Sequence, residues 1–265
     1  MAPIAVICFF AVVGTLVWVV GRELTGLVGL FGYFATPLAE KDRALIHQHS
    51  PYYRRLSPDQ QREFTKRVKH FLFEKEWIGK GFEVTREMRV RIAATATELT
   101  MGFDRLLLLH FSRILVYPDA YEEQSTGQRH LGGTMPGRRT IALSWKHFVE
   151  GAEDPTDARH VGLHELAHAL WLENRIPNGE DDFLDPQAME QWRELAAVEA
   201  SRIRRGEGAL FRDYAATDQA EFFAVAVEYF FEQPVAFQEK LPELYSCMCR
   251  LLRQDPTSSG RSHAG

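Results

Sequence analysis

The chain has 265 residues, of which 45% are hydrophobic and 25% are charged. These shares are ordinary for a globular protein, so they exclude a mainly disordered or low-complexity chain. The formal net charge of −5 also argues against binding to nucleic acid through overall charge, and we expect no direct nucleic-acid partner.

The first 20 residues form a run without a charged side chain. About 20 apolar residues, rising ~1.5 Å each, suffice for a helix to cross the ~30 Å hydrocarbon core of a membrane. No basic residue precedes the run and no clear cleavage site follows it, so the pattern favours an uncleaved anchor over a signal peptide or a buried helix. Arg22, Lys41 and Arg43 follow the run, which favours a cytoplasmic location for the rest of the chain. We therefore expect a single-pass protein of the inner cell membrane.

A second apolar stretch at residues 24–38 is rich in glycine and only about 15 residues long, which is short for a span. We expect it to lie in the membrane interface or to pack on the folded domain; if it did cross, the anchor would become a hairpin. The sequence thus divides into an anchor and juxtamembrane segment at 1–40, a folded domain at 41–256 and a flexible tail at 257–265.

Helical and strand patterns alternate along the folded domain. Ser57 and Gln60 form a capping box at the start of a helix, in which apolar residues from Phe64 to Leu72 recur at helical spacing. Short β-prone runs predict strands at 114–117 and 140–145, with a polar loop at 119–139 between them. Further helices are predicted at 85–99, 155–172, 187–205, 219–232 and 241–252, with a polar loop at 173–186. We expect an α+β fold that is mainly helical, with a small β-sheet.

The predicted helix at 155–172 carries the pattern His-Glu-x-x-His at residues 164–168. Four residues make about one helical turn, so His164 and His168 point the same way and can share one metal ion. Glu165 is turned by ~100° from His164, which places its carboxylate beside the ion, where it can take a proton from a water molecule. Neutral imidazoles suit zinc. The alternative, two surface histidines, is disfavoured because apolar residues flank the motif on both sides.

Two histidines need a third ligand to hold zinc well. His160 lies one turn earlier, but three ligands spread over two turns cannot reach one ion, so we expect it at the surface or behind the ligands. Glu221 and Glu228, on the predicted helix at 219–232, are seven residues apart and share a face. One could ligate the metal while the other orients a histidine, and spacing alone does not decide between them. If neither acid serves a metal site, Glu221 would complete a capping box with Asp218, and Glu228 would be a solvated residue on the helix surface.

At this point the chain shows a resemblance to a known family. The segments HELAHAL and DYAATDQAEFFAVAVEYFFEQP resemble the Mlc titration factor A family of zinc-dependent peptidases and, more distantly, the catalytic domain of anthrax lethal factor. Other matching segments are EVTREMRVRIAATATEL, ILVYP, TIALSW and the PELY and RQDP ending, so the resemblance covers roughly residues 55–256. It implies a gluzincin-like zincin fold for the domain at 41–256.

The family pattern Tyr-x6-Glu-x-Phe-Ala implies site residues that spacing leaves open. It places the third zinc ligand on Glu221, beside His164 and His168, and a catalytic tyrosine on Tyr214, which by default would be a packing residue. Glu165 is then the general base, and Glu228 lies behind the ligands. One departure is visible, because the family often has Asp where this chain has Trp171, which puts a local polar contact in doubt.

The sequence leads to one main hypothesis and two alternatives. We expect a membrane-anchored zinc peptidase that acts on a peptide or protein substrate in the cytoplasm. The predicted strand at 140–145 could hold the substrate backbone as an added strand of the sheet; the alternative is that this strand is only structural. Soluble members of the family are understood to sequester a glucose-responsive transcriptional repressor, so the resemblance also implies a regulatory protein in which zinc is mainly structural. A reversed orientation would make it a secreted or periplasmic enzyme.

Overall fold

The structure is a computed structural model that describes residues 36–106, 108–122, 129–154, 156–177 and 183–258. The predicted anchor at 1–20 and the end of the predicted tail lie outside these residues. No helix within the described ranges combines the length and the apolar character needed to cross a membrane. By its internal contacts the chain divides into residues 1–39 and 40–265, and the fold below is that of the second unit.

A long buried helix, α5, organises the first half of this unit. It is capped by Thr85, whose side chain accepts a hydrogen bond from the Met88 amide, and buried side chains cover all of its faces. Helix α4 packs against it, starting with the predicted capping box between Ser57 and Gln60. The four helices of this part are α2 (Glu40–His49), α3 (Pro51–Arg55), α4 (Pro58–Glu74) and α5 (Arg86–Thr100).

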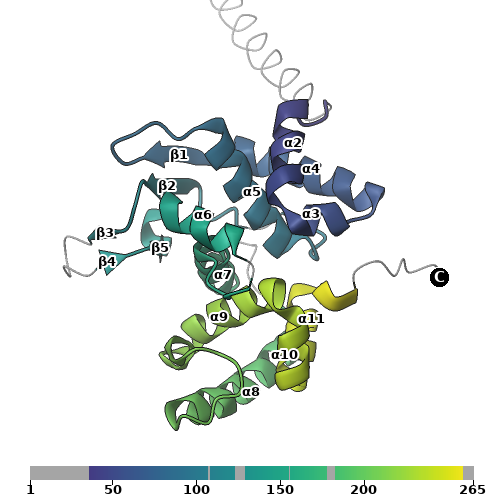
Figure 1. Cartoon of the computed structure of the whole chain (residues 1–265), viewed down its shortest axis with the longest axis vertical. Coiled ribbons are helices and arrows are strands. Elements are labelled where there is room, and N and C mark those ends of the chain that lie inside the picture. The colour runs from purple at the N-terminus through teal and green to yellow at the C-terminus, as the bar shows by residue number, and fades with distance from the viewer. Residues whose placement is uncertain (1–35, 107, 123–128, 155, 178–182, 259–265) are drawn as a thin grey trace, which may run out of the picture. The chain divides into compact units, whose positions relative to one another are not determined.

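A four-stranded sheet has the strand order β1-β2-β6-β5. Figure 1 shows its strands β1 and β2 beside these helices. The first three strands are parallel, and β5 is antiparallel at the edge, with Thr134 opposite Ile141. Every residue of β6 is buried. The strands are β1 (Glu76–Gly79), β2 (Arg113–Tyr117), β5 (Gly132–Met135) and β6 (Thr140–Ser144), and β3 (Tyr121–Glu122) pairs separately with β4 (Arg129–His130).

The predicted loop at 119–139 is therefore wrong in part, because it contains the edge strand β5 and the short 3-10 helix at Pro136–Arg138. The sequence Gly-Gly-Thr-Met has no alternating apolar pattern, so only its pairing with β6 makes it a strand. The hypothesis that residues 140–145 take up a substrate strand is also wrong. Both edges of β6 are already paired, with β2 on one side and β5 on the other.

The predicted helix at 155–172 begins later than expected. Helix α6 (Trp145–Glu153) follows β6 directly, and α7 (Val161–Glu173) carries the His-Glu-x-x-His motif. His160 is the N-cap of α7, because its Nδ1 accepts hydrogen bonds from the amides of Gly162 and Leu163. His160 is only 8% exposed, so of the two positions expected for it, the one at the surface is wrong.

The second half of the unit is helical. Helix α9 is buried along almost its whole length, from Phe222 to Phe231, and packs against α7 (Figure 1). Helix α10 was not predicted; Pro234 starts it directly after α9 ends. The elements are α8 (Pro186–Arg204), the 3-10 helix η2 (Asp213–Ala216), α9 (Gln219–Glu232), α10 (Pro234–Lys240), α11 (Pro242–Leu252) and η3 (Pro256–Ser258).

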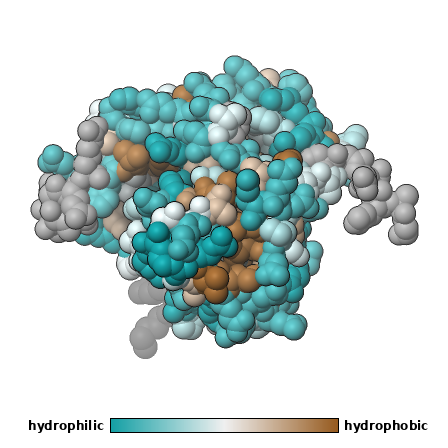
Figure 2. Space-filling view, turned by 60° about the horizontal axis from the view of Figure 1, so that its bottom comes forward, coloured by the Kyte–Doolittle hydropathy of each residue, from teal (hydrophilic) through white to brown (hydrophobic). Residues whose placement is uncertain are grey.

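The described elements confirm the expected α+β class, mainly helical with a small sheet. Figure 2 shows a face that is mostly hydrophilic, with hydrophobic side chains gathered in an area near its centre. Large aromatic side chains fill the interior, among them the fully buried Trp192, Phe222 and Phe223. The core thus forms around α7 and α9, the two helices that carry the candidate site.

Candidate metal centre

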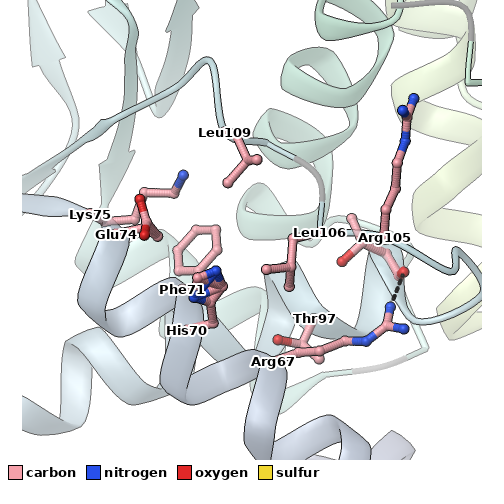
Figure 3. A pocket seen from close by; sticks show the side chains of 10 residues that line it. Arg67, His70, Phe71, Glu74, Lys75, Thr97, Arg105, Leu106 and Leu109 are labelled. Atoms are coloured by element: carbon pink, nitrogen blue, oxygen red, sulfur yellow. Dashed lines mark hydrogen bonds between the residues drawn. The ribbon is translucent and has the colours of Figure 1, made fainter. Parts of the chain in front are cut away.

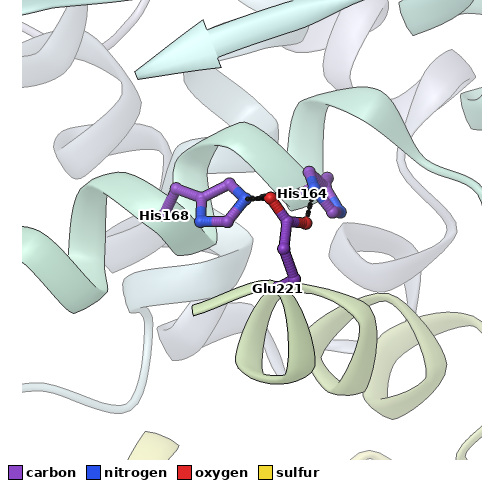
Figure 4. A group of neighbouring side chains, drawn as sticks. All are labelled: His164, His168 and Glu221. Atoms are coloured by element: carbon purple, nitrogen blue, oxygen red, sulfur yellow. Dashed lines mark hydrogen bonds and ion pairs between the residues drawn. The ribbon is translucent and has the colours of Figure 1, made fainter. Parts of the chain in front are cut away.

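Three side chains from α7 and α9 converge on one point (Figure 4). Nε2 of His164 and Nε2 of His168 are 3.1 Å apart. The Glu221 carboxylate faces both rings, with Oε2 at 3.1 Å from Nε2 of His164 and Oε1 at 3.4 Å from Nε2 of His168. The structure thus brings together the three residues that the sequence suggested as metal ligands.

The donor atoms of this cluster fit a bound cation. Nδ1 of His164 lies 2.7 Å from the Glu228 carboxylate, so in a neutral ring it carries the proton and Nε2 presents a lone pair to the cluster. Oε2 of Glu221 is buried and makes no hydrogen bond within the described residues, although it lies close to His164. Two imidazole nitrogens and one carboxylate that converge in this way can hold a metal ion, and they are donors that zinc accepts.

The charges around the cluster point to the same conclusion. Burial by itself lowers the pKa of His164, but the carboxylates of Glu221 and Glu228 raise it to about 10. Burial by itself raises the pKa of Glu221, whereas the rings of His164 and His168 hold it well below its usual range. Without a metal the cluster therefore keeps an extra proton on His164 between two carboxylates. A divalent cation would replace that proton.

Glu228 lies behind His164 and is held by an arginine. Its side chain is 1% exposed, and Nη2 of Arg212 donates to Oε1 at 2.5 Å. Nη1 of the same arginine donates to the Ala158 carbonyl at 2.5 Å, which ties the segment before α7 to α9. Glu228 is therefore not a solvated helix residue. No pattern in the sequence points to Arg212, a single arginine just before the 3-10 helix at Asp213–Ala216.

Glu165 is buried next to the cluster, on the side of the edge strand β5. Burial raises its pKa above the ordinary value, while the nearby histidines lower it in part. The Thr134 hydroxyl lies 3.1 Å from Oε2 of Glu165 and 3.0 Å from its carbonyl oxygen, so it can donate to either. A β-carbon at Gly132 would lie 2.4 Å from Cγ of Glu165, so only glycine fits there. Neither Thr134 nor Gly132 was predicted as a site residue, and the adjacent glycines Gly132 and Gly133 are the feature of the sequence that indicates a close approach of the backbone.

Tyr214 lies on the open side of the cluster. It is 51% exposed, and its ring centroid is 6.1 Å from that of His164, so the default role of a packing residue is wrong. Burial of the hydroxyl and the charge of Glu221 raise its pKa to about 12, so the phenol stays protonated at neutral pH and can donate a hydrogen bond.

The structure also gives the roles of Asp218, which caps a helix, and of Trp171, which packs in the core. Asp218 caps α9 by accepting from the amides of Ala220 and Glu221, so it leaves the Glu221 side chain free to face the histidines. Trp171, the departure from the family pattern, is 4% exposed and packs on Phe223 with ring centroids 5.1 Å apart.

Comparisons with known proteins agree with this arrangement. The model of the family described as glucose-regulated metallo-peptidase M90 matches residues 33–253. An uncharacterized protein of Synechocystis is 28% identical over 241 residues, covering 84% of this chain and 87% of the relative. Mlc titration factor A of Enterobacter sp. strain 638 is 28% identical over 229 residues (79% and 85%), and that of Klebsiella pneumoniae strain 342 is 28% identical over 227 residues (78% and 83%).

Proposed function

The chain belongs to the glucose-regulated metallo-peptidase family M90, and from that premise we propose that it is a zinc-dependent peptidase of the gluzincin-like type. The observation that carries the proposal is the convergence of His164, His168 and Glu221 beside the buried carboxylate of Glu165. On this proposal Nε2 of each histidine and the Glu221 carboxylate hold the ion. Bound zinc would supply a Lewis acid that polarises a carbonyl and lowers the pKa of water.

The remaining residues position protons around the reaction. Glu165 accepts a proton from the attacking water and passes it to the leaving amine. The Thr134 hydroxyl holds the carboxylate of Glu165 against strand β5. Tyr214 keeps its proton at neutral pH and can donate it as a hydrogen bond to the oxyanion that develops on the substrate.

Strand β5, rather than β6, is the place where a substrate could extend the sheet. Within the described sheet β5 pairs only with β6, so no described strand occupies its outer edge, and a substrate strand could be added there. Thr134 on β5 contacts Glu165, so a peptide along that edge would pass beside the general base. This supports a substrate that binds in an extended conformation.

Replacing Glu165 with glutamine tests the proposal. We expect Glu165→Gln to lose at least 10³-fold in peptidase activity while it keeps its zinc, because the amide can no longer accept the proton. The matched control is Glu239→Gln, an exposed residue on α10. Activity should be measured on a peptide library, and zinc by elemental mass spectrometry. Full activity in Glu165→Gln would refute the role of Glu165, and a folded chain that takes up no zinc would refute the metal centre.

A second function is suggested by the name of the Mlc titration factor A relatives. In that case the chain would bind a transcriptional regulator and the metal would serve mainly to organise the fold. Expressing Glu165→Gln in place of the native protein separates the two functions. Full cellular function without peptidase activity favours the regulator, and loss of both favours the peptidase.

We also propose that residues 1–20 anchor the peptidase domain to the inner membrane with its carboxyl side in the cytoplasm. The proposal rests on the uncharged apolar run and on the basic residues that follow it. A reporter fused after residue 265 tests it: activity of a cytoplasmic reporter supports the orientation, and activity of a periplasmic reporter contradicts it.

A further inference from the structure

A cavity of about 300 Å³ lies away from the candidate metal centre, between helices α2, α3, α5, α6, α7 and α9. It reaches the first turn of α7 at Leu163 and the last turn of α9 at Glu232, so it adjoins both helices that carry the proposed metal ligands. Its volume is in the range of small-molecule sites.

One end of the cavity is lined by buried hydrogen-bond donors. Arg91 is 7% exposed; its guanidinium lies 5.2 Å above the Trp145 ring, and its nearest carboxylate is Glu87 at a long 3.5 Å. His160 accepts two amide hydrogen bonds at Nδ1, so its proton is on Nε2. Burial lowers the pKa of His160 to about 4, which keeps the ring neutral. Both of these hydrogen bonds are made at Nδ1, and the ring borders the cavity.

The other end of the cavity is lined by two carboxyl groups. Oε2 of Glu232 is buried and finds no hydrogen-bond partner in the described part of the chain. Burial raises the pKa of Glu232 to about 9, and the charges of Glu228 and Glu98 add to the increase. Burial also raises the pKa of Glu98 to about 7, which Arg55 at the cavity rim offsets only in part. A cation between the two carboxyls would stabilise both as anions.

The two ends are set apart by the geometry of α5. Arg91 and Glu98 are seven residues apart, nearly two turns, so they lie on one face of the helix about 10 Å apart along its axis. The lining also includes apolar side chains, Ala94 on α5 with Ile46, Phe148 and Phe231 from neighbouring helices, beside polar ones such as Thr95 and Tyr52.

A second pocket lacks these features (Figure 3). It measures about 20 Å³, room for about one water molecule. Its cations already have acceptors, because Arg67 donates to the Thr100 carbonyl at 3.1 Å and Lys75 to the Leu108 carbonyl at 2.6 Å. Of these two pockets, the larger cavity is therefore the one with room for a ligand.

We propose that the larger cavity binds a short peptide of about three residues with both termini free. Its carboxylate would accept hydrogen bonds from Arg91 and from Nε2 of His160, and its ammonium group would lie between Glu98 and Glu232. An extended residue spans at most ~3.6 Å, so three residues cover the ~10 Å between the two ends. The apolar residues of the lining, among them Phe148 and Phe231, suit a central apolar side chain. Because His160 caps α7, the bound carboxylate would be tied to the start of the helix that carries the metal ligands.

Calorimetry on the full-length zinc-loaded protein tests this proposal. The Glu165→Gln background is used so that the peptide is not hydrolysed. The probes are Ala-Leu-Ala with free termini and the same peptide with its amino end acetylated or its carboxyl end amidated. We expect the free peptide to bind and each blocked peptide to bind at least tenfold more weakly. No measurable heat at 10 mM free peptide, or equal binding of all three, would overturn the proposal.

Variants of the acidic end separate the cavity from the metal centre. Glu98→Gln and Glu232→Gln remove charges without changing shape, and neutral amides suit a buried position, so both should fold. Each should weaken the free peptide at least tenfold and leave the acetylated peptide unchanged. If both variants bind the free peptide like the background protein, the peptide occupies another site and the proposal fails. The result is independent of peptidase activity, so it can be read even if the proposed function is wrong.

Discussion

The carboxylate of Glu228 lies 2.7 Å from Nδ1 of His164, while Nε2 of the same ring faces His168 and Glu221. The buried acid thereby decides which nitrogen of His164 carries the proton and which presents a lone pair. Glu228 is held in turn by Arg212. The proposed ligand His164 is thus oriented by a chain of charged groups that runs from the segment before α9 into its centre.

Replacing Glu228 with glutamine should weaken zinc binding by about 10- to 100-fold, because the amide orients His164 without the negative charge. Competition with a chromophoric chelator measures the affinity. The matched control is Glu232→Gln, one turn further along α9, which should bind zinc like the native protein. Equal affinities in all three proteins would contradict the role given to Glu228.

Removing the Thr134 hydroxyl should lower kcat by about tenfold, since Glu165 loses the contact that aligns its carboxylate with the edge strand. Thr134→Val tests this, and Thr134→Ser, which keeps the hydroxyl, should retain most of the rate. Zinc content should be unchanged in both. A valine variant as active as the serine variant would show that Thr134 does not position Glu165.

A methyl group at Gly132 should displace Glu165, because the new β-carbon would lie 2.4 Å from its Cγ. We expect Gly132→Ala to lose about 100-fold in kcat/KM, the size of effect that follows from moving a catalytic group by about 1 Å. Gly137→Ala is the control, because nothing lies within 4 Å of a β-carbon there. Steady-state kinetics on one peptide substrate compares the two, and equal losses would show that the effect does not come from the contact of Gly132 with Glu165.

Tyr214→Phe should lower kcat by about 10²- to 10³-fold with little change in KM, as expected when a hydrogen-bond donor to an oxyanion is removed. The pKa of this hydroxyl is raised to about 12, so the native enzyme should show no loss of rate from Tyr214 ionisation between pH 7 and pH 9. Rate profiles of the native and variant enzymes over that range check both statements. A phenylalanine variant that changes only KM would place Tyr214 in substrate binding instead.

Stability should fall as the pH rises, owing to the buried carboxyl of Glu232. Its pKa is raised from an ordinary 4.5 to about 9 by burial and by the charges of Glu228, Glu98, Asp157 and Asp154. Between these values the folded chain keeps a proton that the unfolded chain has released, so increasing pH favours unfolding. Glu232→Gln should therefore gain in Tm over the native protein as the pH rises from 6 to 9. A constant difference in Tm across that range would show that Glu232 does not titrate as described.

The sequence was sufficient for features set by local patterns. The capping box at Ser57 predicted the start of α4, and the helices predicted at 85–99 and 219–232 agree with α5 and α9 to within one residue. His164 and His168 could be paired in advance because one helical turn separates them. The resemblance added Glu221 and Tyr214, which spacing along the chain left undecided.

Only the tertiary structure decided the strands and side-chain roles that depend on contacts with residues far away in the sequence. Strand β5 exists because β6 pairs with it, and Thr134 and Gly132 matter only because this pairing brings them to Glu165. Arg212 likewise gains its role from the packing of α9 against α7. The paired acids Glu98 and Glu232 belong to helices more than 100 residues apart and meet at one cavity. Local periodicity specifies which face of an element is apolar, but the geometry of a site also needs the distances between elements, which only the folded chain sets.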